Sequence, residues 1–486
     1  MVRFAASPAG DPELRRLAAG TLLVAFRGTT APGWILRELE SGLGGVTLFG
    51  FNISDPAQLA ALTARLRTAG DPVVSLDEEG GDVTRLAYHT GSPYPGNAAL
   101  GVVDDVALTR QVYRAIGEEL AGCGVNLDMA PDADVNTADD NPVIGTRAFG
   151  DDPLLVARHT VAAVEGLQSA RVAACVKHFP GHGATRQDSH LEIPLVDADL
   201  DLLHAREFTP FRAAIDAGTQ AIMTAHVRIP ALTGEAPATL SSAALTELLR
   251  GEFGFKGVVI TDALDMKAIA GSVGLVEGAV LSLAAGSDLL CLGPLPTYDD
   301  VRQIIAGIMA AVGEGRLPVS RLEEAAERVA RLLAWTRGPA EPGAETTGIG
   351  LTAARRAIRL HGSPGPLVNP LVVEVETPPT IAVGEVPWGF AEWLPQAEVV
   401  RVKPDAAAGP LLERAADRSL VVVVKDAHRS PAARAFVSAL LAGRPDATVV
   451  EMGLPIWRPE TAAYLATYGA ARANAQAAAE LLMPVS

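Results

Sequence analysis

The amino-acid sequence predicts an α/β protein with a (β/α)8 TIM-type barrel followed by a smaller three-layer α/β sandwich domain. Eight short apolar runs occur in the first two thirds of the chain, and helical stretches separate most of them. A segment rich in Gly, Pro, Glu and Thr, residues 337–350, then precedes a second alternation of strand-like and helical segments. Eight strand–helix repeats are the pattern of a parallel barrel.

The eight predicted strands are short and apolar, as expected for a parallel sheet that is covered on both faces. In chain order they are Thr21–Phe26, Gly45–Phe49, Val73–Leu76, Val125–Met129, Ala173–Val176, Ala221–Thr224, Val258–Thr261 and Asp288–Leu292. The clearest helices between them are Pro56–Ala69, Ala107–Ala121, Pro153–Ser169 and Ala243–Gly251. Several strands end in a polar residue, and such residues converge on one face of a barrel: Asp77, Asp128, Lys177, His226 and Asp262.

The remaining elements give the domain boundaries. A helix over Leu322–Trp335 closes the barrel, so we predict a barrel domain over residues 1–337, a linker over 338–350 and an α/β sandwich domain over 351–486. The strands predicted for the second domain are Thr380–Val383, Glu398–Val402, Ser419–Val424 and Thr448–Met452. Its predicted helices are Thr352–Leu360, Pro431–Ala442 and Glu460–Tyr468.

The composition is that of a globular protein with ample material for a core. The 486 residues are 49% hydrophobic and 20% charged, and the formal net charge is −17. Such an acidic chain does not favour nucleic acid or an anionic membrane as a partner, and no segment predicts an obligate protein partner. The three cysteines lie in apolar segments, which favours free thiols and a reducing compartment. Because neither a signal region nor an apolar run of about 18 residues occurs, we expect a cytoplasmic protein.

The most informative segment begins at Lys177, ends at His190 and reads KHFPGHGATRQDSH. It continues from a buried strand, so its polar groups are expected at the strand's C-terminal end, where barrel enzymes carry out their chemistry. Asp188 is two residues from His190; a carboxylate beside an imidazole fixes its tautomer and raises its pKa, so the pair can deliver a proton near neutral pH. A self-stabilising or metal-binding loop is the alternative. The spacing of His178, His182 and His190 does not match the usual zinc patterns, so we expect no metal and no cofactor.

Two further strand ends carry carboxylates. Val258–Thr261 delivers Asp262, which is placed to attack an electrophilic carbon or to stabilise a cation. Val73–Leu76 is followed by Asp77, which can accept two hydroxyl hydrogen bonds, and by Arg85, which can pair with Asp77 or with a ligand. A solvated acidic loop is the alternative for this second segment.

A long loop and a sixth strand complete the set of candidate residues. Residues 130–150 show little apolar periodicity, and long irregular loops in compact domains are usually functional. Arg147 is the candidate ligand contact in this loop, with a structural salt bridge as the alternative. His226 follows the strand Ala221–Thr224, where a structural histidine competes with a role in the site.

Four segments together resemble glycoside hydrolase family 3, in the family's order and spacing over residues 15–335. They are KHFPGHG with DSH, TDALDM, LDEEGG with Arg85, and NPVIGTRAF. The KHFPGHG and DSH combination is typical of the bacterial β-N-acetylglucosaminidases of peptidoglycan recycling. One departure is Phe51, since the residues after LFG are usually Arg-Asn in that family and are Phe51-Asn52 in this chain.

The resemblance implies a retaining, exo-acting β-N-acetylglucosaminidase. It implies that Asp262 is the nucleophile and that His190, assisted by Asp188, is the acid/base. It also implies that the non-reducing GlcNAc is held by Asp77, Arg85, Arg147, Lys177 and His178, and His226 is added as a substrate-binding candidate. The second domain carries no matching catalytic motif, so we assign it no catalytic role.

Three questions stay open at this point. A neutral histidine tolerates an anionic acceptor, so a phosphorylase that uses phosphate in place of water is the alternative enzyme. A catalytically idle sugar-binding protein is the alternative of another class, and the intact set of Asp262, Asp188 and His190 argues against it. The aglycone can be a peptidoglycan fragment, a chitooligosaccharide or another glycoside.

Overall fold

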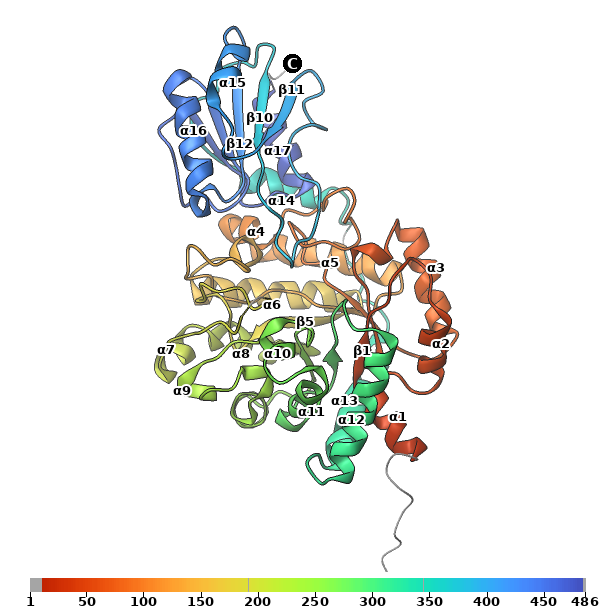
Figure 1. Ribbon diagram of the computed structural model, residues 1–486. Helices are drawn as coiled ribbons and strands as arrows, with labels where there is room; N and C mark the ends of the chain where they lie inside the picture. The colour runs from red at the N-terminus through yellow and green to blue at the C-terminus, as the bar shows by residue number, and fades with distance from the viewer. Residues whose placement is uncertain (1–10, 191, 344, 484–486) are drawn as a thin grey trace, which may run out of the picture.

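The computed structural model of the chain describes residues 11–190, 192–343 and 345–483. These residues form an eight-stranded parallel barrel and a separate six-stranded sheet with helices on both faces (Figure 1). The second domain lies on the side of the barrel that carries helices α4 (Asn97–Val103) and α5 (Val106–Gly122). The predicted fold class, a TIM-type barrel followed by an α/β sandwich, is confirmed.

The barrel strands lie in the order β7-β6-β5-β4-β3-β2-β1-β8, and all neighbours are parallel. A parallel bridge between Ile260 and Leu289 joins the two ends of this sheet. Each strand falls on a predicted run: β1 Leu22–Val24, β2 Gly45–Thr47, β3 Val73–Leu76, β4 Leu127–Asp128, β5 Ala173–Phe179, β6 Ala221–Thr224, β7 Val258–Thr261 and β8 Leu290–Cys291.

Alternate residues of each strand enter two different cores. In β1, Leu22 and Val24 pack toward the surrounding helices, whereas Leu23 packs inside the barrel. Both faces are therefore apolar, which explains why these strands read as continuous hydrophobic runs. Since the barrel interior is filled, polar side chains gather beyond the strand ends.

The barrel helices are capped as their sequences suggest. Asp55 accepts a hydrogen bond from Gln58 N at the start of α3, and Asp152 accepts one from Leu154 N at the start of α6. The helices are α1 Pro12–Gly20, α2 Gly33–Glu40, α3 Pro56–Arg67, α6 Pro153–Ser169, α7 Leu200–Ala205, α8 Phe208–Asp216, α9 Pro230–Thr233, α10 Lys267–Ala270, α11 Leu275–Ala285, α12 Tyr298–Gly313 and α13 Val319–Thr336. The predicted helix Ala243–Gly251 forms a π-helix over Ala243–Glu252.

The second sheet has the order β11-β10-β12-β13-β14-β9, and only the edge strand β9 is antiparallel to its neighbour. Separate apolar cores lie on its two faces, so the domain has three layers. Its elements are α14 Ile349–Ala357, β9 Arg359–Gly362, β10 Leu371–Val375, β11 Glu398–Val402, α15 Ala408–Arg414, β12 Leu420–Val424, α16 Pro431–Gly443, β13 Thr448–Glu451, β14 Ala463–Ala466 and α17 Arg472–Leu482.

Two predictions for this domain are wrong and one is partly so. Residues 380–383 form no strand, because Pro378 and Pro379 precede them and cannot donate ladder hydrogen bonds. The predicted helix Glu460–Tyr468 contains β14, whose four residues pair with β13, so tertiary pairing overrides helix propensity there. The predicted helix Thr352–Leu360 ends at Ala357, and the chain continues into β9.

Residues 337–348 connect α13 to α14 without a helix or strand in the part that is described. We propose that the two domains divide within this connection, as the composition predicts. In the described ranges, no helix has both the length and the apolar character that a membrane crossing requires.

Candidate active site

Polar side chains that follow several strands of the barrel meet in one cavity of about 590 Å³. Asp77 follows β3, Lys177 and His178 belong to β5, and Asp262 follows β7. All four line the cavity, as do Arg85, Arg147 and His190. Of the five residues predicted to converge, Asp77, Lys177 and Asp262 line this pocket, which is the candidate active site. Asp128 does not line it: its side chain is buried in the barrel and accepts a hydrogen bond from Glu78 N.

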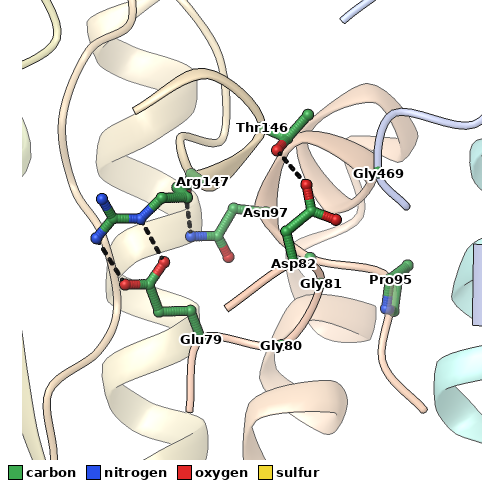
Figure 2. Close-up of a pocket in the computed structure, with 10 residues that line it drawn as sticks. Glu79, Gly80, Gly81, Asp82, Pro95, Asn97, Thr146, Arg147 and Gly469 are labelled. Atoms are coloured by element: carbon green, nitrogen blue, oxygen red, sulfur yellow. Dashed lines mark hydrogen bonds and ion pairs between the residues drawn. The ribbon is translucent and has the colours of Figure 1, made fainter. Parts of the chain in front are cut away.

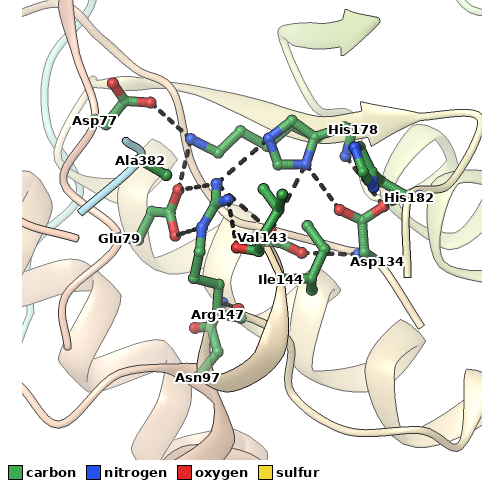
Figure 3. Close-up of polar contacts among 12 residues, drawn as sticks. Asp77, Glu79, Asn97, Asp134, Val143, Ile144, Arg147, His178, His182 and Ala382 are labelled. Carbon is green, nitrogen blue, oxygen red and sulfur yellow. Dashed lines mark hydrogen bonds and ion pairs between the residues drawn. The ribbon is translucent and has the colours of Figure 1, made fainter. Parts of the chain in front are cut away.

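Four charged side chains form what we call the cavity floor: Asp77, Glu79, Arg147 and Lys177. The Lys177 ammonium lies 2.7 Å from Asp77 Oδ1 and 2.6 Å from Glu79 Oε1. Arg147 donates to both oxygens of Glu79, at 2.8 and 2.9 Å (Figures 2 and 3). Burial raises the pKa of the Glu79 carboxyl, but Arg147 and Lys177 outweigh it and hold that pKa well below its usual range. Two cations and two carboxylates thus compensate one another out of solvent.

The loop of residues 130–150 is ordered by its own polar side chains. Asn141 accepts hydrogen bonds from the backbone N–H groups of Val143 and Ile144 and donates to the carbonyl oxygens of His182 and Gly183. Arg147 is the last residue of the short 3-10 turn Gly145–Arg147, and its side chain points toward Glu79 (Figure 3). The structure therefore gives Arg147 a buried ion pair as well as a place in the cavity wall.

His178 is held between two charged groups. Its Nδ1 lies 2.7 Å from Asp134 Oδ2, and Arg147 donates to its Nε2 at 3.3 Å (Figure 3). Burial, with the Arg147 charge, lowers the pKa of His178 to about 4, so the ring is neutral with its proton on Nδ1. Asp134 was not among the residues predicted from the sequence. Its position in the long irregular loop, two residues after Asp132, could have marked it as a candidate.

Asp132, Asp134 and His178 are the described side chains that come close enough to share a cation. Their ligand atoms lie within 4.8 Å of one another, and all three residues are buried. The Arg147 guanidinium lies 3.7 Å from Asp132 Oδ2. Because this guanidinium already supplies a positive charge at the cluster, the donor set does not require a metal.

Asp262 lies partly open to the cavity, and its Oδ1 accepts a hydrogen bond of 2.7 Å from Ala263 N. Burial raises the pKa of the Asp262 carboxyl, and the imidazoles of His226, His178 and His190 more than offset this effect. Its pKa therefore lies below the usual value, and the group is an anion at neutral pH.

Residues 186–190, which we call the dyad loop, bring Asp188 and His190 together. His190 Nδ1 lies 2.7 Å from Asp188 Oδ1, and the backbone N–H of His190 donates to the same oxygen. Their side chains are 20% and 19% exposed. Ser189 between them contacts Nε2 of the buried His182 at 3.0 Å, which ties the loop to the cavity wall. The predicted dyad spacing thus produces the predicted contact.

The structure does not bring His226 to the cavity wall. Its Nδ1 lies 2.7 Å from Thr239 Oγ1 and its Nε2 lies 3.0 Å from Ala263 O. The ring is fully buried, and both nitrogens are engaged by protein groups. We therefore correct the prediction that His226 contacts substrate; it holds the backbone beside Asp262 instead.

The second domain forms part of the cavity wall. Ile381, Ala382 and Gly384 line the cavity, and Ala382 O accepts a hydrogen bond of 2.9 Å from Arg85. Sequence patterns could not predict this contact, because the two residues are 297 positions apart. Phe51, the departure from the family pattern, also lines the cavity, and the Arg27 guanidinium lies 4.3 Å from its ring centroid.

A barrel that gathers carboxylates, imidazoles and cations in one polar pocket is suited to bind and cleave a small polar substrate such as a sugar. Residues 35–332 match the family described as "Glycosyl hydrolase family 3 N terminal domain". The chain belongs to this family and is a glycoside hydrolase.

Named relatives and a solved structure agree with this family. The chain is 35% identical over 327 residues to "Beta-hexosaminidase A" of Pseudoalteromonas piscicida, a match that covers 61% of this chain and 54% of that protein. It is 34% identical to "Beta-hexosaminidase" of Nitrosomonas eutropha, over 64% of this chain and 92% of the relative. A glycoside hydrolase family 3 beta-N-acetylglucosaminidase from Paenibacillus sp. superposes with a TM-score of 0.86 at 33% identity, over 96% of each chain.

Proposed function

We propose that this protein is a retaining, exo-acting β-N-acetylglucosaminidase that removes a non-reducing terminal β-GlcNAc residue. The observation that carries the proposal is one cavity that holds an anionic Asp262 and, on the dyad loop, a His190–Asp188 pair at 2.7 Å. A retaining glycosidase needs a nucleophile and an acid/base on opposite sides of the scissile bond. The description of the similar Paenibacillus structure as a beta-N-acetylglucosaminidase supports GlcNAc as the sugar.

In the first step, Asp262 attacks the anomeric carbon and forms a covalent glycosyl-enzyme. Because His190 Nδ1 is directed at Asp188, its Nε2 is the atom that donates a proton to the leaving oxygen. In the second step the same nitrogen takes a proton from water, which attacks the anomeric carbon and releases GlcNAc with its β configuration. Asp188 keeps the tautomer and stabilises the imidazolium.

The cavity floor is the proposed site for the GlcNAc ring. Asp77 is 17% exposed, and its Oδ2 has only a 3.5 Å contact with Arg85, so it can accept sugar hydroxyl groups. Arg85, Arg147, Lys177 and His178 complete this set of proposed sugar contacts. The surrounding charges are already paired, so the floor binds a neutral sugar without ordering new ions.

We further propose that the enzyme acts in peptidoglycan or chitooligosaccharide turnover and in a reducing, cytoplasmic compartment. The three cysteines, Cys123, Cys175 and Cys291, are buried and free. Burial raises the pKa of each of these thiols, so they are not poised for thiolate chemistry.

Product analysis tests the reaction. The protein is incubated with 4-nitrophenyl β-GlcNAc, with and without inorganic phosphate, and the anomeric proton of the first product is followed by NMR. We expect β-GlcNAc first and a rate that does not depend on phosphate. Initial α-GlcNAc would show an inverting enzyme, and GlcNAc-1-phosphate would show the alternative phosphorylase.

A further inference from the structure

The second domain has the strand order of a doubly wound α/β fold. From β10 the chain adds β11 on one side, and β12, β13 and β14 follow on the other side. The order therefore reverses between β10 and β12. In open α/β sheets, ligands bind at such a reversal, in the crevice beyond the carboxyl ends of the strands.

A groove of about 930 Å³ lies at this reversal. One wall consists of the C-terminal part of β11 and of the segments that follow β10 and β12, and it includes Trp388, Arg401 and Arg429. The other wall is the barrel loop of residues 141–147. Its size is in the upper range of small-molecule sites, and the proposed mechanism places no part of the substrate in it.

The groove continues into the active-site cavity. Val143, Arg147, Ile381 and Gly384 line both spaces. The dyad lies at the junction: Asp188 lines the groove, whereas His190 lines the cavity. Asp262 lines the cavity and not the groove.

This placement fixes the direction of the substrate. The acid/base of a retaining glycosidase stands on the leaving-group side of the sugar, and the nucleophile stands on the opposite side. A GlcNAc held on the cavity floor, with Asp262 behind it, therefore directs its leaving group past the dyad and toward the groove.

We infer that the groove binds the leaving group, namely the sugar units of an oligosaccharide that follow the scissile bond. This inference rests on the proposed β-N-acetylglucosaminidase function and adds the class of aglycone. Trp388 provides an aromatic side chain in the wall, with the Arg401 guanidinium 4.9 Å from its ring centroid. The indole ring of Trp388 can pack against the C–H face of a sugar ring, and the polar groups beside it can bind the sugar hydroxyls.

The charges of the groove favour a neutral occupant. Among the described residues, four cationic side chains line the groove: Lys425 lies 3.0 Å from Asp82, Arg401 lies 2.7 Å from Glu374, Arg147 lies 2.8 Å from Glu79, and Arg429 is the fourth. Asp82, Asp188 and Asp426 contribute carboxylates to the same wall. Glu376 and Glu385 add negative charge to the wall. An anionic aglycone meets no excess of positive charge here, whereas the hydroxyls of neutral sugars can use both kinds of group.

The test measures kcat/KM for 4-nitrophenyl β-GlcNAc and for chitooligosaccharides of two to five units. Two groove variants are compared, Val383→Ala and Trp388→Ala, because both residues line the groove and neither lines the active-site cavity. Val383 is partly exposed, so its truncation leaves the fold intact even if Trp388→Ala is unstable. Ile456→Ala, with a side chain 42% exposed, and Trp457→Ala are matched controls from the same domain outside the groove.

For the native protein we expect kcat/KM to rise about tenfold from the disaccharide to the tetrasaccharide. The ratio of kcat/KM for the tetrasaccharide to that for the aryl glycoside should fall about tenfold in the groove variants and stay unchanged in the controls. No gain with chain length, or an equal fall in the controls, would overturn the inference. Absence of turnover of the aryl glycoside by the native protein would instead refute the proposed function.

Discussion

Glu79 on the cavity floor is 2% exposed and bonded to two cations, whereas Asp188 in the dyad loop is 20% exposed and bonded to its neighbour in sequence. The floor is held from three parts of the chain, and three of its four side chains are buried, with Asp77 partly exposed toward the cavity, so it is suited to position a sugar. The dyad is a local pair on a loop, open to water, which suits a group that must give a proton and then take one back. This difference in burial and in partners assigns sugar binding to the floor and proton transfer to the dyad loop.

The largest effect is expected for Asp262, the proposed nucleophile. Asp262→Asn should lower kcat by more than about 10⁴-fold, because the amide cannot attack the anomeric carbon. The folded protein should be retained, as judged by thermal unfolding. A 2-fluoro glycoside should label Asp262 in the native enzyme, and a label on Asp265 or Asp188 would contradict the assignment.

The dyad loop should respond in a way that depends on the leaving group. His190→Ala should lower kcat by about 10³-fold for poor leaving groups, since these need protonation, and less for 4-nitrophenol. Azide needs no base to attack the glycosyl-enzyme, so it should partly restore turnover of the aryl glycoside. Equal losses for both substrate types without azide rescue would make His190 a structural or binding residue.

The cavity floor should contribute strongly to stability. Glu79→Ala leaves Lys177 and Arg147 buried with only part of their negative partners, so unfolding free energy should fall by about 3–5 kcal/mol. Urea unfolding measures this change. Arg356→Ala is the control, because its pair with Asp105 is exposed and such pairs contribute about 1 kcal/mol or less. Similar losses in both variants would refute the compensated floor.

The last prediction concerns pH. Asp132 is fully buried, its Oδ2 has no hydrogen-bond partner among the described residues, and burial with the Asp134 charge raises its pKa. The carboxyl of Asp132 therefore holds its proton more tightly in the folded protein than in the unfolded chain, where its pKa is about 3.9. Its protonated form adds fully to the free energy of unfolding below that unfolded-state pKa, and this stabilisation is lost as pH rises through the folded-state pKa.

Asp132→Asn should remove this pH dependence. Relative to the variant, the native protein should lose unfolding free energy as pH rises above about 4, by at most about 1.4 kcal/mol per pH unit. Thermal unfolding of both proteins from pH 4 to 9 measures the difference. A native protein that gains on the variant over this range would show that Asp132 is stabilised as an anion by Arg147.

Much of the barrel could be predicted because its signals are local. A buried parallel strand is apolar on both faces, so each of the eight runs could be predicted as a strand from its own residues alone. The second domain was harder: β14 has helix-forming residues and becomes a strand only by pairing with β13.

The sequence by itself determined that Asp77 and Asp262 follow buried strands and that Asp188 contacts His190, because two residues on one turn are close in any compact conformation. Lys177 was expected after its strand, and in the structure β5 continues through it to Phe179. Only the tertiary structure decided the partners that come from distant segments. His178 is fixed by Asp134, 44 positions away, and Arg85 is bonded to the second domain. Barrel closure and domain packing create these contacts, and neither leaves a periodic pattern in the sequence.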